Sequence, residues 1–357
     1  MRPTYAQHAS ARFNDWLHEV LQRLTADVQR ALEENLVALI LGGGYGRGEG
    51  GIICDDGIER PYNDLDLTLV VRRKRRCPWD RLDEIKKRYE TELGIEIDFS
   101  RPLTIGDIKR WPHWLMWYDL LHGHVVLAGP PDILTAHAPA RLNDPPPTIE
   151  ATRLLLNRGA GLLWAERIVR RIESPPDDDF VRRNYFKCAL ALGDALLIVH
   201  RRFATPYRGR DARLERLMAE RSDVAALELA SLYRAALQFK FRPDRAPDGS
   251  LDRTRLRGLG ERWGAVFLYV ERHRTGRAWS TLSDYVRWSG LREPEQHTPV
   301  RLVRNVIRNR QLGLWSWRYP REQLYRRLPV LLGLTDASVS DWATETGRFL
   351  DIWRRFN

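Results

Sequence analysis

The chain carries LGGGYGRGEGG at residues 41–51 and NDLDL at residues 63–67. The first motif is a glycine-rich turn that follows LVALIL, residues 36–41, a short apolar run typical of a buried strand. Glycines allow positive φ angles and close approach of the backbone. A turn of this kind can therefore point several N–H groups at an anion.

The second motif places two carboxylates on one face of a strand. Successive strand side chains alternate between faces, so Asp64 and Asp66 project together while Leu65 and Leu67 point to the core. Two like charges this close are unfavourable unless a cation or a proton lies between them. Mg²⁺ prefers carboxylate oxygens together with substrate phosphates. The two motifs together therefore indicate chemistry on a nucleoside triphosphate.

A third acid on a neighbouring strand would complete the metal site. IEIDFS, residues 95–100, alternates apolar and acidic residues, as a half-buried strand does. Asp98 is our candidate third ligand, and Glu96 is a weaker candidate on the same strand face. Asp64, Asp66 and Asp98 are thus the predicted catalytic residues and metal ligands of a site for two Mg²⁺ ions.

The glycine turn alone is weaker evidence, because glycine-rich turns have several uses. A P-loop is excluded, since no GK[ST] follows the turn. Gly46, Gly48 and Gly51 satisfy G-x-G-x-x-G, but the next element is an acidic strand and no helix pattern opens after the turn. A tightly packed structural turn stays an open alternative for the glycines by themselves.

Strand and helix patterns alternate around these motifs up to about residue 140. Apolar periodicity predicts helices over residues 6–36, 79–93 and 105–121, and strands over residues 36–41, 65–71, 95–100 and 124–128. LNDPPPT, residues 142–148, is the best candidate linker. Beyond it, helical patterns recur at residues 149–172, 180–203, 225–241, 259–272, 300–310 and 341–353.

We therefore predict an α+β fold with two domains. Residues 1–141 would form a catalytic domain, a mixed sheet flanked by helices and preceded by the N-terminal helix. Residues 142–357 would form an all-α domain that closes a cleft over nucleotide and acceptor.

The composition is that of a globular protein. With 43% hydrophobic residues, 13 Trp and 12 Tyr, it has too many aromatics for a disordered chain. No apolar run approaches the roughly 18 residues of a membrane span, and the N-terminus lacks the apolar core of a signal peptide. Cys54, Cys77 and Cys188 are scattered, which suggests neither a disulfide partner nor a zinc site. We expect a cytoplasmic protein with no membrane partner.

The formal net charge of +11 favours anionic partners, although it does not choose among nucleotides, nucleic acid and acidic small molecules. Arg301, Arg304 and Arg308 share one face of a predicted helix, which is either a solvated face or an acceptor surface. Lys187 and Asp194 share an apolar stripe and need partners. They could pair with each other or with another helix, or face the nucleotide, so Lys187 is a candidate nucleotide-binding residue.

The ordered set of motifs resembles the nucleotidyltransferase superfamily typified by DNA polymerase beta, which includes small bacterial antibiotic and minimal nucleotidyltransferases. The family pattern is an apolar strand, Gly-Gly or Gly-Ser, often Arg-Gly, then an Asp-x-Asp strand and a third Asp on a later strand. The matching residues here are Gly43, Gly44, Arg47, Gly48, Asp64, Asp66 and Asp98. The resemblance covers roughly residues 36–130.

The resemblance implies a Mg²⁺-dependent transferase and a nucleotidyltransferase-fold sheet. It would move a nucleoside monophosphate, expected to be AMP, from an NTP such as ATP to a hydroxyl-bearing acceptor, with release of pyrophosphate. Asp64 and Asp66 would bind both ions, and Asp98 would bind the catalytic ion and accept or steer the acceptor proton. Gly43 and Gly44 would hold the β- and γ-phosphates.

Arg47 and Gly48 would then lie beside the phosphates, with the Arg47 charge neutralising them. Two departures from the family pattern concern the same region. Many relatives have serine at the position of Gly44, and residues 49–63 form a longer insertion than usual, which we interpret as a hairpin or loop that could shape acceptor access.

The acceptor stays open: a small molecule, a protein side chain or an RNA end would each suit the motifs. A catalytically degenerate protein that binds nucleotide or RNA is the alternative from another functional class. A toxin–antitoxin component that modifies tRNA or protein is a further alternative.

Overall fold

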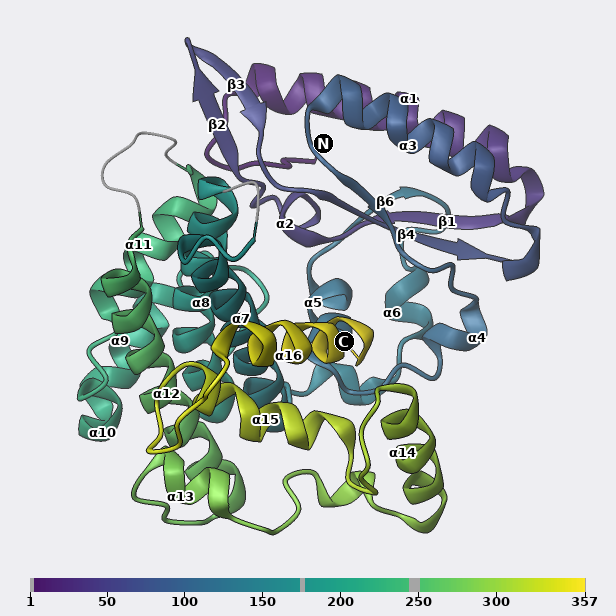
Figure 1. Ribbon diagram of the computed structural model, residues 1–357. Coiled ribbons are helices and arrows are strands. Elements are labelled where there is room, and N and C mark those ends of the chain that lie inside the picture. Colours follow the sequence, from purple (N-terminus) through teal and green to yellow (C-terminus); the bar gives the residue numbers. More distant parts are fainter. Residues whose placement is uncertain (1–2, 174–176, 244–250, 357) are drawn as a thin grey trace. The chain divides into compact units, whose positions relative to one another are not determined.

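Two units make up the computed structural model, which describes residues 3–173, 177–243 and 251–356 (Figure 1). The first comprises the described residues of Met1–Pro147, Arg201–Asp211 and Leu237–Asp244, and the second comprises the rest. The mixed sheet flanked by helices in the N-terminal part and the helical C-terminal part confirm the predicted α+β fold class. None of the helices in the described ranges is both long and apolar enough to cross a membrane.

The first unit is built on a four-stranded sheet in the order β5-β4-β1-β6. β1 (Leu36–Leu41) is antiparallel to β4 (Leu65–Val71) and to β6 (Val125–Ala128). β5 (Ile97–Phe99) is parallel to β4, and the helix α3 (Trp79–Leu93) forms the crossover between them. This connection is the kind that a parallel pair requires.

Helices cover both faces of this sheet. On one face, α1 (Ala11–Leu32) and α3 share a core with the sheet residues Leu39, Leu41, Leu65, Leu67 and Leu69 (Figure 1). On the other face lie α4 (Ile105–Ile108), α5 (Leu115–His122) and α6 (Ile133–His137), packed against Ala38, Ile40 and Val70. The strands with continuous apolar runs are therefore buried on both sides, as their sequence indicates.

Two expected helices of this unit differ in the structure. The helix predicted over residues 6–36 begins only at Ala11, because the Ser10 hydroxyl caps it by accepting from the Phe13 N–H. The prediction of one continuous helix over residues 105–121 is wrong, because α4 and α5 are separate helices. Pro112 interrupts the pattern, since proline lacks an N–H and disfavours a helical residue before it.

The insertion after the glycine turn forms a hairpin of β2 (Ile52–Asp55) and β3 (Ile58–Pro61). Asp56 and Gly57 form its tip, with φ angles of 52° and 78°. Positive φ at both central residues is the geometry of a tight hairpin turn, which an Asp-Gly pair favours. The hairpin reading of residues 49–63 therefore holds, while its predicted effect on acceptor access stays a prediction.

The second unit is helical. Its helices are α7 (Ile149–Val169), α8 (Asp178–Val199), α9 (Arg210–Glu220), α10 (Ser222–Ala225), α11 (Ala230–Phe241), α12 (Arg253–Thr275), α13 (Leu282–Arg287), α14 (Pro299–Gln311), α15 (Pro320–Leu331) and α16 (Trp342–Phe356). The start of α9 and the last turn of α11 belong to the first unit. Short 3₁₀ turns lie at Glu33–Asn35, Lys74–Arg76 and Ala140–Asn143 in the first unit and at Pro294–Gln296 in the second.

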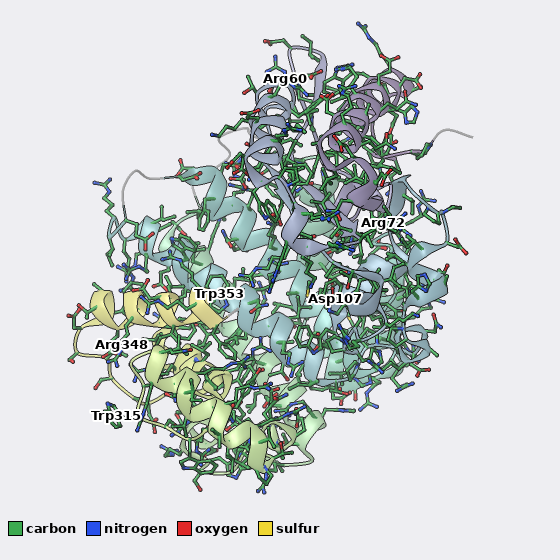
Figure 2. All side chains as sticks on the ribbon, turned by 90° about the vertical axis from the view of Figure 1, so that its right-hand side faces the viewer. Arg60, Arg72, Asp107, Trp315, Arg348 and Trp353 are labelled. Atoms are coloured by element: carbon green, nitrogen blue, oxygen red, sulfur yellow. The ribbon has the colours of Figure 1, made fainter. Side chains whose placement is uncertain are left out.

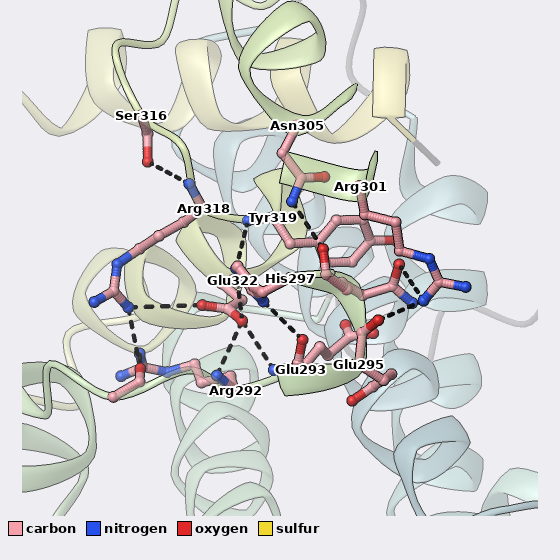
Figure 3. Close-up of polar contacts among 12 residues, drawn as sticks. Arg292, Glu293, Glu295, His297, Arg301, Asn305, Ser316, Arg318, Tyr319 and Glu322 are labelled. Carbon is pink, nitrogen blue, oxygen red and sulfur yellow. Dashed lines mark hydrogen bonds and ion pairs between the residues drawn. The ribbon is translucent and has the colours of Figure 1, made fainter. Parts of the chain in front are cut away.

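Buried charges in the second unit are paired rather than isolated. Glu322 is fully buried and accepts hydrogen bonds from the backbone N–H groups of Arg292 (3.0 Å) and Glu293 (2.9 Å) (Figure 3). Glu293, also fully buried, accepts from the Tyr325 hydroxyl at 2.8 Å and forms an ion pair with Arg153 at 2.5 Å. A buried carboxylate is tolerated only with such partners.

Candidate functional site

The glycine turn is tied directly to the carboxylate strand. The Gly42 N–H donates to the carbonyl oxygen of Asp66 at 2.8 Å, and the short helix α2 (Gly43–Gly46) follows. Gly43 has φ +59°, and a Cβ placed there would overlap the Asp66 carboxylate and lie 2.8 Å from its Cγ. Only glycine suits both the angle and the space, so the Asp66 carboxylate lies against the turn.

Not every glycine of the turn is needed for a ligand. Gly50 packs against the ring of Tyr45, where a Cβ would overlap. Tyr45 is fully buried, donates to the carbonyl of Gly51 at 2.7 Å and accepts from the Tyr62 N–H at 3.1 Å. Burial raises the pKa of Tyr45 well above its ordinary value, so the hydroxyl stays a donor at neutral pH. The structural interpretation of the glycines therefore applies to this half of the turn.

Gly44 is different, because a side chain has room there. The atoms nearest to a Cβ at this position are the carbonyl oxygen of Glu49 at 3.4 Å, the Cα of Gly50 at 3.5 Å and the Nζ of Lys240 at 3.7 Å. These are ordinary van der Waals separations. The serine found here in many members of the resembled superfamily would fit this backbone.

The predicted carboxylates lie on neighbouring strands. Asp66 on β4 is in register with Asp98 on β5, and Leu65 with Ile97. Residues in register on adjacent strands point to the same face. Asp64 directly precedes β4 and is two residues from Asp66, so it belongs to that face as well.

The three carboxylates differ in exposure. Asp66 is half-buried, whereas Asp64 and Asp98 are exposed. The two exposed acids line a shallow depression of about 710 Å³ with Lys86, Glu90 and Glu96. An acidic strand end therefore opens to solvent, and Asp66, two residues after Asp64, connects it to the glycine turn.

The donor set suits Mg²⁺, which takes carboxylate oxygens. Strand register brings Asp66 and Asp98 side by side, and Asp64 lies two residues before Asp66 with an exposed side chain. As they stand, the side chains in residues 3–173, 177–243 and 251–356 include no group of three or more His, Cys, Asp or Glu arranged to hold a metal ion. The residue types and strand positions fit the ion, and the ligand roles stay predictions.

Arg47 and Gly48 have structural roles in the turn. The Arg47 Nε lies 3.5 Å from Glu49 Oε2, with side-chain exposures of 12% and 3%, so this is a largely buried ion pair. Glu49 also accepts from the N–H groups of Tyr207 (3.0 Å) and Arg208 (2.9 Å). Gly48 has φ +75°. Contact of either residue with phosphate stays a prediction.

Lys240 and Tyr207 are candidate site residues that the sequence analysis missed. Both belong to the first unit, through the segments Leu237–Asp244 and Arg201–Asp211. The Lys240 Nζ lies 4.7 Å from the centre of the Tyr207 ring, a cation–π distance, and close to Gly44. No short-range spacing could have indicated them, because they follow the glycine turn by more than 150 positions in the chain.

Lys187 lies on α8 in the second unit, with an exposed side chain. It lines a cavity of about 320 Å³ with Leu154, Asn157, Arg158, Gly161, Trp164, Phe180, Arg183, Asn184 and Trp353. Asp194, which we considered as its partner, is buried and accepts from the Tyr233 hydroxyl at 2.6 Å. A cavity with three cationic and no acidic lining residues suits an anion, and the nucleotide-binding role of Lys187 stays a prediction.

The chain is similar to two solved structures described as nucleotidyltransferases. One is a spectinomycin adenyltransferase from Enterococcus, solved with ATP and spectinomycin, at 12% identity over 69% of this chain and 98% of that one, with a TM-score of 0.39. The other is a nucleotidyltransferase-like protein from Exiguobacterium sibiricum, at 14% identity over 82% of this chain and 92% of that one, with a TM-score of 0.24. No protein-family model and no curated protein matches the chain. At these scores, function has to be inferred from the site itself.

Proposed function

We propose that the protein is a Mg²⁺-dependent nucleotidyltransferase that moves a nucleoside monophosphate, AMP being the expected one, from an NTP to a hydroxyl-bearing acceptor. The observation that carries this proposal is the Asp66 carboxylate held against Gly43, with Asp98 in register beside it. Packing alone gives little reason for an acidic side chain on a strand to lie where only a glycine with positive φ can adjoin it. A phosphate-binding turn joined to a metal-binding strand accounts for the acid and for the glycine.

Asp64, Asp66 and Asp98 would hold Mg²⁺, which when bound neutralises phosphate charge and favours loss of the acceptor proton. The backbone N–H groups of Gly43 and Gly44, which lack carbonyl partners within the short helix α2, would bind the β- and γ-phosphates. Lys240, near Gly44, adds a positive charge that favours the polyphosphate.

The transfer balances without a further reactant. The acceptor oxygen attacks the α-phosphorus and forms a new P–O bond, while the bond to the bridging α–β oxygen breaks and pyrophosphate leaves with the electron pair. Asp98, exposed at the end of the β4–β5 pair, accepts the hydroxyl proton and returns it to water. Arg47 and Glu49 act indirectly, by holding the turn in place.

The test is incubation of the protein with Mg²⁺, a cell extract and each of the four α-labelled NTPs in turn. We expect label from one NTP, ATP first among them, to appear in RNA, in a protein or in a small molecule, and pyrophosphate to be released in step. The labelled class identifies the acceptor. Calorimetric binding of Mg²⁺–ATP with no label transferred and no pyrophosphate released would instead favour the degenerate binding protein.

Replacing Lys240 by glutamine should weaken NTP binding by at least about tenfold, because a charge-assisted hydrogen bond to phosphate contributes about 1.5–3 kcal/mol. Calorimetry with Mg²⁺–ATP measures the change. Lys109→Gln is the matched control, since Lys109 is exposed and lies outside the site. Lys187→Gln is measured in the same way, and a loss of affinity is expected if Lys187 binds nucleotide. Unchanged affinity in Lys240→Gln would remove Lys240 from the site.

A further inference from the structure

The helix α14 in the second unit presents an apolar stripe to solvent. Val300, Val303 and Ile307 have 74%, 63% and 52% of their surfaces exposed. Their spacing of three and four residues places them on one side of the helix. Exposed aliphatic side chains that gather on one face indicate an interaction surface more often than isolated ones do.

On the opposite side of α14 the fully buried side chains are polar, and the apolar Leu302 and Val306 beside them are only partly buried. Asn305 is 2% exposed and donates to the carbonyl of Gln296 at 3.0 Å (Figure 3). Asn309 is fully buried and donates to the carbonyls of Ser316 (2.8 Å) and Arg318 (2.7 Å). A helix on a protein surface normally buries its apolar side. Here amide hydrogen bonds and the partly buried Leu302 and Val306 hold the helix, so its outward stripe is a second, separate apolar face.

Arginines flank the stripe. α14 carries Arg301, Arg304, Arg308 and Arg310, all exposed, and its sequence has no acidic residue. At about 100° per residue, Arg304 and Arg308 lie on one side of the stripe and Arg310 on the other. Trp315, just beyond the helix, is 92% exposed, and its side chain projects from the ribbon in Figure 2. Its ring centre lies 5.7 Å from the Arg310 guanidinium carbon, which links it to α14.

We infer that α14 and Trp315 form a docking surface for an anionic lipid membrane, which revises the expectation from the sequence that the protein has no membrane partner. A helix that lies in a membrane interface places its apolar stripe among the acyl chains and its arginines among the headgroup phosphates on either side. Tryptophan is favoured at the same depth. Trp315 could stack on a base, but Val300, Val303 and Ile307 could not, so the aliphatic stripe favours acyl chains over nucleic acid. Four arginines would repel those of a second copy.

Sedimentation with vesicles of phosphatidylglycerol and phosphatidylcholine at low ionic strength tests this inference, with phosphatidylcholine vesicles as the uncharged comparison. Wild-type protein should bind the anionic vesicles and lose binding as salt rises. The double variant Val303→Ser, Ile307→Ser should weaken binding at least about tenfold, because fewer CH₂ groups are then buried in the acyl region and each contributes to the free energy of membrane binding. Each side chain is exposed, so the variants should keep the wild-type thermal melt.

Arg304→Gln should weaken vesicle binding about fivefold, the effect of removing one charge near an anionic surface. Arg257→Gln is the matched control, because its side chain is 80% exposed on α12, away from α14, and the charge change is equal. Equal losses in both variants would mean that net charge alone binds the vesicles and would overturn the inference. So would absence of wild-type binding. The inference would also be overturned if the surface bound single-stranded RNA through Trp315 and the two serine changes left that binding unchanged.

Discussion

Asp66→Asn is expected to reduce nucleotidyl transfer by about 10³-fold while the protein stays folded. The amide keeps the shape of the side chain, which lies against Gly43, and removes the negative charge that would hold Mg²⁺. Asp64→Asn should have a comparable effect for the same reason. Release of pyrophosphate, measured with the acceptor identified by labelling, gives the rate. Circular dichroism and thermal melts establish that the fold remains.

Asp132→Asn is the matched control for these variants. Asp132 is exposed before α6, outside the predicted site, and its side chain makes no capping hydrogen bond to that helix. The charge change is the same, and activity should remain within about twofold of wild type. Full activity in the double variant Asp64→Asn, Asp66→Asn would rule out the proposed reaction at this site.

The sheet could be predicted because its strands are short, continuous apolar runs bounded by glycine or charge. β1 and β4 appear in the structure at the residues expected, Leu36–Leu41 and Leu65–Val71. α15 was not anticipated, because Pro329 lies inside it and its charged residues obscure the apolar stripe. In that case tertiary packing outweighs a local signal that argues against a helix.

The candidate site, like the fold, could be predicted from the sequence only in part. Asp64, Asp66 and Asp98 could be found because their spacing within strands is local information. The neighbourhood of Gly44 and Lys240 could not, because it depends on a contact between distant segments. The sequence also cannot rank the glycines of the turn, since identical letters stand at positions with different φ angles and different space for a side chain.

Gly43→Ala and Gly44→Ser are therefore expected to differ sharply in activity, although each replaces one of two adjacent glycines by a larger residue. At Gly43 a methyl group would overlap the Asp66 carboxylate, and φ +59° costs a non-glycine residue about 1–2 kcal/mol. Asp66 must then move away from its position. A displacement of about 1 Å in a positioned catalytic group can cost about 10²-fold in rate, so we expect a loss of that size or more.

At Gly44 the same backbone accepts a side chain, since the nearest atoms lie 3.4 Å or more from the Cβ position. Serine is also a better helix former than glycine, which should raise the free energy of unfolding by a few tenths of a kcal/mol. Its hydroxyl would lie near the proposed phosphates, so affinity for Mg²⁺–ATP should stay equal or rise. Urea unfolding, calorimetry and the pyrophosphate assay on both variants measure these effects. Equal activity in the two variants would mean that the contact between Gly43 and Asp66 does not organise the site, because that contact is the feature that separates them.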